Sequence, residues 1–378
     1  MKEIFASNYI SKSVSRIDTS EVRKLFDLVG KIENPINLSI GQPDFPVPEA
    51  VKEAYIKAIR EDKNAYTASQ GILPLRERIS SKWQIENKIQ ISAENIIVST
   101  GVASLLYLLF EAMFDEQDEI LLIDPYFLLY ESLAKLRNLK VSYISENFDR
   151  EQLNKLDETG CKPKAIIFAN PSNPTGKILS KEQLTNLSEY AQKHDSILVS
   201  DEIYEAFDYD SKFISMATIN PHRTVTLGGF SKSHAMTGLR VGYLGVPEPL
   251  KPLLEKITAL QQYSIVCSPQ PAQWAALQAL DTDITSELAL MKERRDLVVK
   301  LLSDKVQYTT PEGAFYVFPE VPTGSVHFVE QSIKERLLVV PGYIFSQNDN
   351  AVRISYAQPS EIIEEGLHIF LKMVERLS

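Results

Sequence analysis

The sequence predicts an α/β protein: a mostly parallel central sheet with helices on both faces, plus a smaller α+β domain. The first observation is that short apolar runs alternate with amphipathic helical stretches through the middle of the chain. The second is that these runs are continuously apolar, which is typical of strands covered on both faces. The third is that this alternation stops near residue 246.

Several N-terminal stretches have apolar residues at helical spacing, and prolines mark where the chain must be extended. Two prolines flank Phe45, so the segment around it cannot be helical. We therefore expect helices at 19–31, at 49–60 and from about Pro74, a strand at 36–41, and an extended loop at 42–48.

The central sheet is expected to begin at 95–99, where NIIVS runs into a small-residue turn at 100–104 and an apolar helix at 105–114. A strand that turns sharply into a helix aims free backbone N–H groups at an anion. One such turn is a weak indication alone, since every strand-to-helix connection needs a turn. The sheet continues with strands at 119–123, 141–144, 165–169, 197–200, 223–227 and 239–246, and with helices at 127–136 and 181–194.

Beyond residue 246 the pattern changes to long helices and short mixed strands, which indicates a second, α+β domain. Helices are expected at 249–262, 271–280, 286–302 and 328–337 and at the C-terminus, with strands in GAFYVFP, LVVPG and AVRISYA. We expect residues 1–45 to form an N-terminal arm and part of the small domain, residues 46–280 the large domain, and residues 281–378 the small C-terminal domain.

Composition excludes several classes of protein. A net charge of −10 argues against a broad nucleic-acid surface, because phosphate backbones require clustered positive charge. Cys161 and Cys267 lack a metal-type spacing and are too few for a disulfide scaffold, so we expect free thiols and no metal. The N-terminus has no apolar signal-peptide core, and no apolar run is long enough to span a bilayer. A cytoplasmic protein without membrane partners is expected.

In open parallel sheets, ligands bind beyond the carboxyl ends of the strands. Asp201 directly follows the apolar strand ILVS, so it is either a helix cap or a paired functional charge. Lys232, considered alone, would be a solvated surface lysine. Its Gly/Ser-rich loop, however, is one of the segments that could meet at one pocket, together with 101–104, 124–127, 170–176 and 201–204.

Four motifs follow one another in a fixed order: NPSNPTG at 170–176, D-x-x-Y from Asp201, S-K-x-x-x-M-T-G-x-R-x-G from Ser231, and the arginine of RISYA, Arg353. In this combination the chain resembles the class I/II aminotransferase family of fold type I pyridoxal-phosphate enzymes, over roughly residues 20–370. The resemblance implies pyridoxal 5'-phosphate as cofactor, bound by the large domain.

The resemblance also implies roles around the cofactor ring. Lys232 would form the Schiff base with the cofactor's aldehyde and then act as general base on the α-proton, which suits a deprotonated amine. Asp201 would pair with the pyridine nitrogen and keep it protonated, which strengthens the ring as an electron sink. Tyr204 and Asn173 would bond the ring 3-oxygen, and Phe127 would stack on the ring face.

At the phosphate, the resemblance assigns Arg240 and the backbone N–H groups of Val102 and Ala103. Tyr66 would reach the phosphate of a neighbouring subunit's cofactor, which implies a homodimer with shared active sites. Ser231, beside the lysine, would supply a further cofactor contact.

For the substrate, Arg353 would bind the α-carboxylate in a bidentate pair, and Gly41 would close over that carboxylate with its backbone. Asn173 would also contact substrate. Residues 259–271 contain no arginine for a distal carboxylate, so dicarboxylate specificity by that route is not supported. Tyr263 and Phe315 are candidates for the side-chain pocket, with core packing the favoured role for each.

Some positions depart from the family pattern. Hydroxyl residues are usual where this chain has Ala103 and Gly229, so two phosphate hydrogen bonds would be missing. Ser346 replaces the second glycine of PGxxFG and is expected only to alter a loop. His234, beside the lysine, is more simply a loop residue than a catalytic one. The hydroxyls that could substitute at the phosphate are those of Ser104, Ser231 and Ser233.

The function expected from this resemblance is transamination: an amino acid gives its amine to the cofactor, and a 2-oxo acid accepts it in a ping-pong cycle. A β-eliminating C–S lyase of the same fold is the enzymatic alternative, since the same residues serve both reactions. A catalytically idle cofactor-binding module is a third possibility. The presence of Lys232, Asp201 and Arg353 together argues against it.

Overall fold

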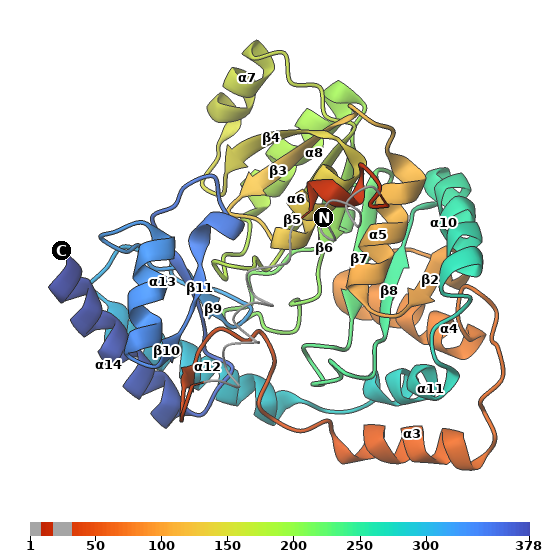
Figure 1. Cartoon of the computed structure of the whole chain (residues 1–378). Helices are drawn as coiled ribbons and strands as arrows, with labels where there is room; N and C mark the ends of the chain where they lie inside the picture. The colour runs from red at the N-terminus through yellow and green to blue at the C-terminus, as the bar shows by residue number, and fades with distance from the viewer. Residues whose placement is uncertain (1–8, 18–31) are drawn as a thin grey trace.

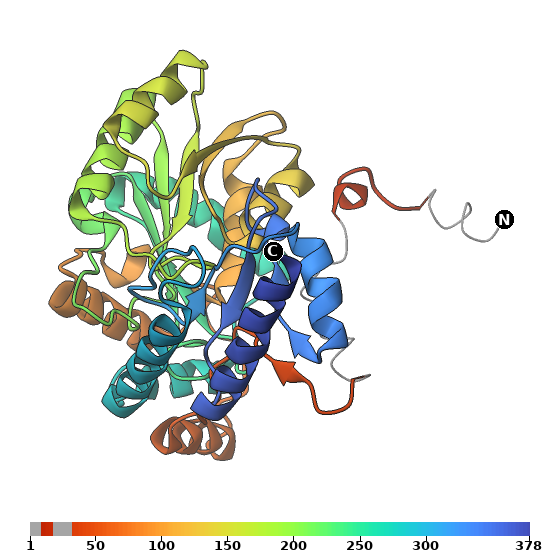
Figure 2. The same ribbon diagram turned by 90° about the vertical axis from the view of Figure 1, so that its left-hand side faces the viewer.

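The structure, a computed structural model, describes residues 9–17 and 32–378. The helix expected at 19–31 lies outside the described residues. A twisted central sheet with helices around it forms the larger part of the molecule, and the C-terminal elements stand beside that sheet (Figures 1 and 2).

The central sheet has seven strands, and only β8 runs antiparallel to its neighbours. The expected fold class is therefore confirmed. In spatial order the strands are β2 (Ile96–Ser99), β8 (Gly242–Gly245), β7 (Thr224–Gly229), β6 (Ile197–Asp201), β5 (Ala165–Ala169), β3 (Glu119–Asp124) and β4 (Lys140–Ser145).

Both faces of the sheet are buried, which explains the continuous apolar runs. Along β3, Ile120 and Leu122 pack on one face with α5 and α6, whereas Leu121 and Ile123 pack on the other with α8. The covering helices are α5 (Val102–Met113), α6 (Leu128–Arg137) and α10 (Lys251–Ser264) on the first face, and α7 (Arg150–Glu158), α8 (Lys181–His194) and α9 (Met216–Ile219) on the second. The helices α3 (Glu49–Arg60), α4 (Leu73–Lys82) and α11 (Gln270–Ala279) pack beside β2 and β8.

A separate apolar core unites the C-terminal elements with the N-terminal strand β1 (Ile36–Asn37). β1 pairs in parallel with β10, so the start of the chain joins its end. This agrees with the expectation that the N-terminal segment completes the small domain, while the domain boundaries stay a prediction. The C-terminal elements are α12 (Thr285–Leu302), β9 (Tyr316–Val317), α13 (Ser325–Lys334), β10 (Leu337–Leu338), β11 (Val340–Pro341), β12 (Val352–Ser355) and α14 (Ser360–Leu377).

Several boundaries differ from the expectation. The helix after β2 begins at Val102 rather than at 105, because Gly101 ends the turn with a φ of 91°. β1 ends at Asn37 rather than at 41, β8 covers only 242–245 of the expected 239–246, and α13 begins at Ser325 rather than at 328. Two helices were not predicted: α7, although Asp149 and Gln152 form a capping box there, and the short α9.

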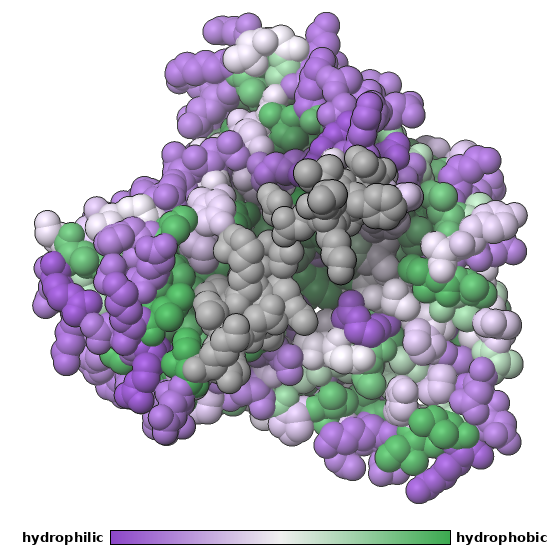
Figure 3. All heavy atoms as spheres, in the orientation of Figure 1, coloured by the Kyte–Doolittle hydropathy of each residue, from purple (hydrophilic) through white to green (hydrophobic). Residues whose placement is uncertain are grey.

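Apolar side chains appear among charged ones, for example over α3 (Figure 3), where Ile56 and Ile59 are exposed. Within the described part of the chain, no helix combines the length and the apolar character that a membrane crossing requires.

Candidate active site

One cavity of about 430 Å³ lies beyond the carboxyl ends of the parallel strands, where the C-terminal elements meet the sheet. Residues far apart in the sequence line it, from the loop after β1 to strand β12. Every site residue expected from the sequence lines this cavity except Tyr66: Gly41, Val102, Ala103, Phe127, Asn173, Asp201, Tyr204, Ser231, Lys232, Arg240 and Arg353.

Asp201, the last residue of β6, is a buried acid held by neutral donors. The Tyr130 hydroxyl donates to its Oδ2 at 2.9 Å, and the Ile203 N–H donates to its Oδ1 at 3.3 Å. Burial raises the pKa of Asp201 to about 6, because the charged carboxylate loses its hydration. Tyr130 was not predicted as a site residue, although it lies one helical turn after Phe127 on the same face.

Lys232 projects from the loop after β7 into the cavity. Its Nζ donates to the Gly41 carbonyl oxygen at 2.6 Å. Burial lowers the pKa of Lys232 to about 8, with help from the positive charges of Arg353 and Arg240 and against the opposing effect of Asp201. The amine is therefore easier to deprotonate than that of an ordinary lysine.

Arg353 on β12 is 4% exposed, and no acidic partner lies within ion-pair distance of it among the described residues. Its Nη1 donates to Asn173 Oδ1 at 3.1 Å and its Nη2 donates to the Ser39 carbonyl oxygen at 2.8 Å. Its Nε is buried without a hydrogen-bond partner. Burial lowers the pKa of Arg353. A buried guanidinium held only by neutral acceptors has the charge and the geometry to bind an incoming carboxylate.

Arg240 and the start of α5 meet at one corner of the cavity. Arg240 donates from Nη1 to the Thr237 carbonyl oxygen at 2.8 Å and from Nη2 to the Thr100 carbonyl oxygen at 3.1 Å. It packs so closely on Gly101 that a Cβ there would lie 2.6 Å from Nη2. The free N–H groups of the first helical turn, including those of Val102 and Ala103, lie at this corner.

The structure separates the three serines considered for the phosphate. Ser104 donates to the Gly101 carbonyl oxygen at 2.8 Å, and Ser233 pairs with His234 Nδ1 at 2.8 Å beside a different cavity. Ser231 is the one of the three that lines the cavity, and Thr237, which the sequence analysis missed, adds a second hydroxyl residue.

Gly229 cannot readily carry a hydroxyl side chain. A Cβ there would lie 3.0 Å from Ile203 Cδ1 and 3.3 Å from the Gly242 Cα. Gly229 and His234 both line a separate cavity behind the lysine loop rather than the one that holds Lys232. Burial lowers the pKa of His234 to about 4, so its ring is neutral at pH 7.

The aromatic candidates for a side-chain pocket do not line the cavity. Phe315 is fully buried against Tyr204 and Phe207, so it packs in the core, as favoured above. Tyr263 is 89% exposed, so in the single chain it neither packs in the core nor lines the cavity. Tyr66 is also exposed and lies outside the cavity of its own chain. Tyr316, which the sequence analysis did not assign, lines the cavity next to Arg353.

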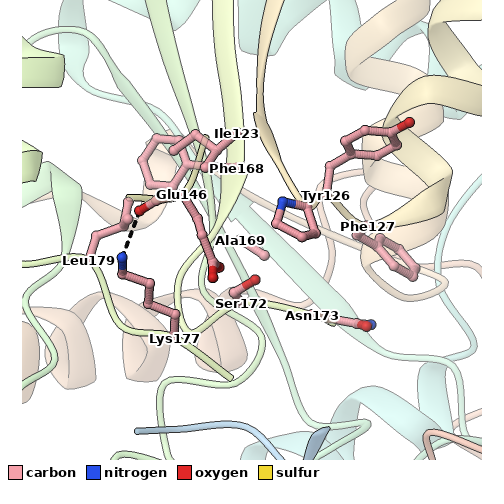
Figure 4. A pocket seen from close by; sticks show the side chains of 11 residues that line it. Ile123, Tyr126, Phe127, Glu146, Phe168, Ala169, Ser172, Asn173, Lys177 and Leu179 are labelled. Carbon is pink, nitrogen blue, oxygen red and sulfur yellow. Dashed lines mark hydrogen bonds between the residues drawn. The ribbon is translucent and has the colours of Figure 1, made fainter. Parts of the chain in front are cut away.

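A small hollow supports Phe127 and Asn173 from behind (Figure 4). Its volume of about 10 Å³ suits one water molecule. On its far side Lys177 Nζ donates to the Glu146 carbonyl oxygen at 2.7 Å, the contact dashed in Figure 4. Phe127 and Asn173 therefore form a thin wall between this hollow and the main cavity.

Comparison with known proteins agrees with this geometry. The family model of aminotransferase class I and II matches residues 33–370. The chain belongs to this family. Transamination that depends on pyridoxal phosphate follows from this membership, and the lyase alternative is not favoured.

Individual relatives cover nearly the whole chain. A probable aspartate aminotransferase of Methanocaldococcus jannaschii is 37% identical over 97% of this chain and 100% of its own length. The aromatic-amino-acid aminotransferase 2 of Thermococcus litoralis is 35% identical over 97% of this chain and 98% of its own. The aspartate aminotransferase structure from Thermotoga maritima has a TM-score of 0.89 at 31% identity and covers 97% of this chain and 100% of that one.

The cavity of this aminotransferase family member fits its cofactor. It brings together an amine for an aldehyde, a buried acid for a ring nitrogen, and an arginine beside a helix N-terminus for a phosphate. Each of these groups lacks an opposite-charge partner within ion-pair distance in the described chain. The charges are thus available for a ligand that carries the complementary groups.

Proposed function

We propose that Lys232, Asp201 and Arg353 divide the work of transamination between them. Bound pyridoxal phosphate supplies an aldehyde and an electron-withdrawing ring. Arg353 binds the α-carboxylate of the amino acid, Lys232 Nζ takes and returns the α-proton, and Asp201 holds a proton on the ring nitrogen. The observation that carries this proposal is Arg353, a buried cation without an acidic partner in the described chain, in the same cavity as Lys232.

The state of Lys232 supports its role as a base. With a pKa of about 8, roughly a tenth of the amine is neutral at pH 7, about three hundredfold more than for an unshifted lysine. Asp201, buried and bonded to Tyr130, is set to accept from a protonated ring nitrogen. An ion pair there would lower the pKa of Asp201 again and so favour the charged form of its carboxyl group.

The remaining contacts orient the cofactor. Tyr204 and Asn173 donate to the ring 3-oxygen, and Phe127 stacks on the ring. Arg240, the N–H groups of Val102 and Ala103, and Ser231 bind the phosphate. Their common position on one cavity supports these assignments.

We also propose a homodimer in which Tyr66 of each chain contacts the other chain's cofactor phosphate. Tyr66 is 84% exposed in the single chain, and Tyr263 is exposed too. Large exposed tyrosines of this kind support the proposal that a second chain covers this part of the surface. Sedimentation should give twice the chain mass, and Tyr66→Phe should weaken cofactor binding without changing that mass. A monomer that keeps full activity would contradict the proposal.

We propose a cytoplasmic location, supported by the free thiols of Cys161 and Cys267. Cell fractionation tests it: the protein should follow a cytoplasmic marker, and its recovery with the membrane or exported fraction would contradict the proposal.

A half-reaction tests the function itself. An amino donor alone should convert the bound cofactor to pyridoxamine phosphate, with the corresponding 2-oxo acid as the other product. Ammonia and pyruvate with an unconverted cofactor would instead identify the β-eliminating lyase. Lys232→Ala should abolish turnover of every donor.

The substrate pair follows from one panel of amino donors, tested with 2-oxoglutarate, pyruvate and oxaloacetate as acceptors. The relatives are named as a probable aspartate aminotransferase and an aromatic-amino-acid aminotransferase, so the panel should contain both kinds of donor and neutral aliphatic donors. A donor without an α-carboxylate should fail if Arg353 has the proposed role.

A further inference from the structure

Tyr316, the first residue of β9, lies where three parts of the candidate site meet. Its hydroxyl oxygen lies 2.8 Å from that of Tyr204. Its ring centroid lies 4.7 Å from the guanidinium carbon of Arg353. A Cβ on Gly41 would lie 2.1 Å from the Tyr316 hydroxyl oxygen, so a glycine at 41 is what allows Tyr316 to reach this position.

Counting protons assigns the direction of the bond between the two tyrosines. A tyrosine hydroxyl has one proton to donate and an oxygen that can accept. Burial raises the pKa of both Tyr204 and Tyr316, so both hydroxyls keep their protons. If the proton of Tyr204 goes to the ring oxygen of the cofactor, the proton between the two tyrosines has to come from Tyr316.

This direction has an energetic consequence. A hydroxyl that accepts a hydrogen bond is polarised and donates more strongly, by about 10–30% per bond in condensed phase. The bond from Tyr316 would therefore strengthen the bond that Tyr204 makes to the ring oxygen.

The ring of Tyr316 has a separate contact. The Arg353 guanidinium carbon lies within 4.7 Å of the Tyr316 ring centroid and 4.8 Å of that of Phe345. Aromatic rings at this distance attract the cation and fix the plane of its fork. The ring therefore orients the group that binds the α-carboxylate.

We propose that Tyr316 is a positioning residue with two separable parts: its hydroxyl reinforces the hydrogen bond of Tyr204 to the cofactor, and its ring holds Arg353 in the plane that receives the substrate carboxylate. The inference rests on the proposed function. One side chain, Tyr316, would thus affect both cofactor binding, through Tyr204, and carboxylate binding, through Arg353.

Two substitutions separate the parts. Tyr316→Phe removes the hydroxyl and keeps the ring. We expect the pH midpoint of the visible absorption of the cofactor-loaded protein to rise by about 0.3 unit, because a weaker bond leaves the ring oxygen more basic. The KM for the amino donor should stay within twofold while kcat falls. Tyr316→Leu removes the ring as well, and should also raise that KM by about fivefold or more.

A double variant and a matched control complete the test. Tyr204→Phe should shift the midpoint further than Tyr316→Phe, and adding Tyr316→Phe to it should shift it no more, because the hydroxyl acts through Tyr204. Tyr356→Phe removes another buried hydroxyl, bonded to the Ala314 carbonyl oxygen at 3.3 Å outside the cavity, and should leave the midpoint unchanged. An unchanged midpoint in Tyr316→Phe, or additive shifts, would overturn the inference. A wild-type protein without a titrating visible band would instead contradict the proposed function.

Discussion

Asp201 and Arg353 are buried side chains of opposite charge in one cavity, and neither has an opposite-charge partner within ion-pair distance in the described chain. Neutral donors hold the acid and neutral acceptors hold the base. Buried charges without partners destabilise the folded protein. A bound ligand with complementary charges would offset that cost. For binding such a ligand, the shape of each charged group matters as much as its sign.

Arg353→Lys should show the importance of shape. The variant keeps the positive charge but loses the planar fork that makes two parallel bonds to a carboxylate. We expect the KM of the amino donor to rise roughly ten- to hundredfold, since a bond to a charged group contributes about 1.5–3 kcal/mol. Arg376→Lys, at an exposed arginine paired with Glu335, is the control and should leave KM unchanged. An unaltered KM in Arg353→Lys would exclude bidentate binding.

The charged residues of the site lie at or near the ends of strands and helices. Asp201 closes β6, and the next residue, Glu202, joins β6 to α9: its Oε1 accepts from Ser200 and Ser215 at 2.9 and 2.8 Å and from the Met216 N–H at 3.2 Å. At the other side of the sheet, Gly101 sets the start of α5 against Arg240. The backbone at strand ends therefore decides where the site's charges lie.

Glu202 should make stability depend on pH. Burial, and then the charge of Glu205, raises its pKa from 4.5 to about 8. The folded state therefore holds a proton that the unfolded state releases, and the stabilisation present below pH 4.5 is lost as pH rises through 8. Glu202→Gln removes this titration. Thermal melts at pH 5 and pH 8 should show the variant losing less stability between them than the wild type, whereas Glu364→Gln, an exposed control, should lose as much.

Gly101→Ala should distinguish the cost of backbone strain from the loss of the proposed phosphate contacts at Arg240 and the start of α5. Gly101 and Gly160 both have positive φ, 91° and 82°, so alanine at either costs about 1–3 kcal/mol of stability. At Gly101 the new Cβ would also push Arg240 away, whereas at Gly160 it meets nothing within 4 Å. We expect only Gly101→Ala to weaken cofactor binding, by about tenfold, measured by equilibrium titration. Equal cofactor affinities in the two variants would contradict the role of this corner.

The whole molecule brings three regions of the sequence to one cavity. The loop after β1 contributes Gly41, the end of β6 and the loop after β7 contribute Asp201 and Lys232, and β12 contributes Arg353. That loop is tied to α12, because Arg294 donates from both Nη atoms to the two carboxylate oxygens of Asp44, at 2.6 and 2.7 Å. The Asp44–Arg294 ion pair therefore fixes the loop whose Gly41 carbonyl oxygen accepts from Lys232.

Breaking this tie should destabilise the chain. Asp44→Asn leaves Arg294, 4% exposed, without its acid, and we expect a loss of about 3 kcal/mol in the free energy of unfolding. The KM of the amino donor should rise as well, because the Gly41 loop is no longer fixed. Denaturant unfolding of Asp44→Asn and of the double variant with Arg294→Met tests this. The double variant should be the more stable of the two, since it removes the unpaired charge; the opposite order would contradict the role of the pair.

Periodicity and turn residues predicted most of the fold. β5 and α8 are found at the expected residues, because a strand buried on both faces requires continuous apolar sequence and a covering helix has apolar residues at helical spacing. Short strands such as β1 were overestimated, since their length depends on a partner strand, β10, that lies 300 residues away. The start of α5 was misplaced because a single backbone angle at Gly101 decides it.

The sequence by itself predicted the family, the cofactor and many of the residues that line the cavity, because the four motifs with their order and spacing carry the resemblance from which these were inferred. Only the tertiary structure decided how they are supported. Tyr130 under Asp201 and Tyr316 between Tyr204 and Arg353 belong to no motif, because their positions follow from packing between distant segments. The tertiary structure also assigned Ser104 and Ser233 to other partners and left Ser231 at the cavity. A hydroxyl can serve any nearby group, and only the fold decides which one is near.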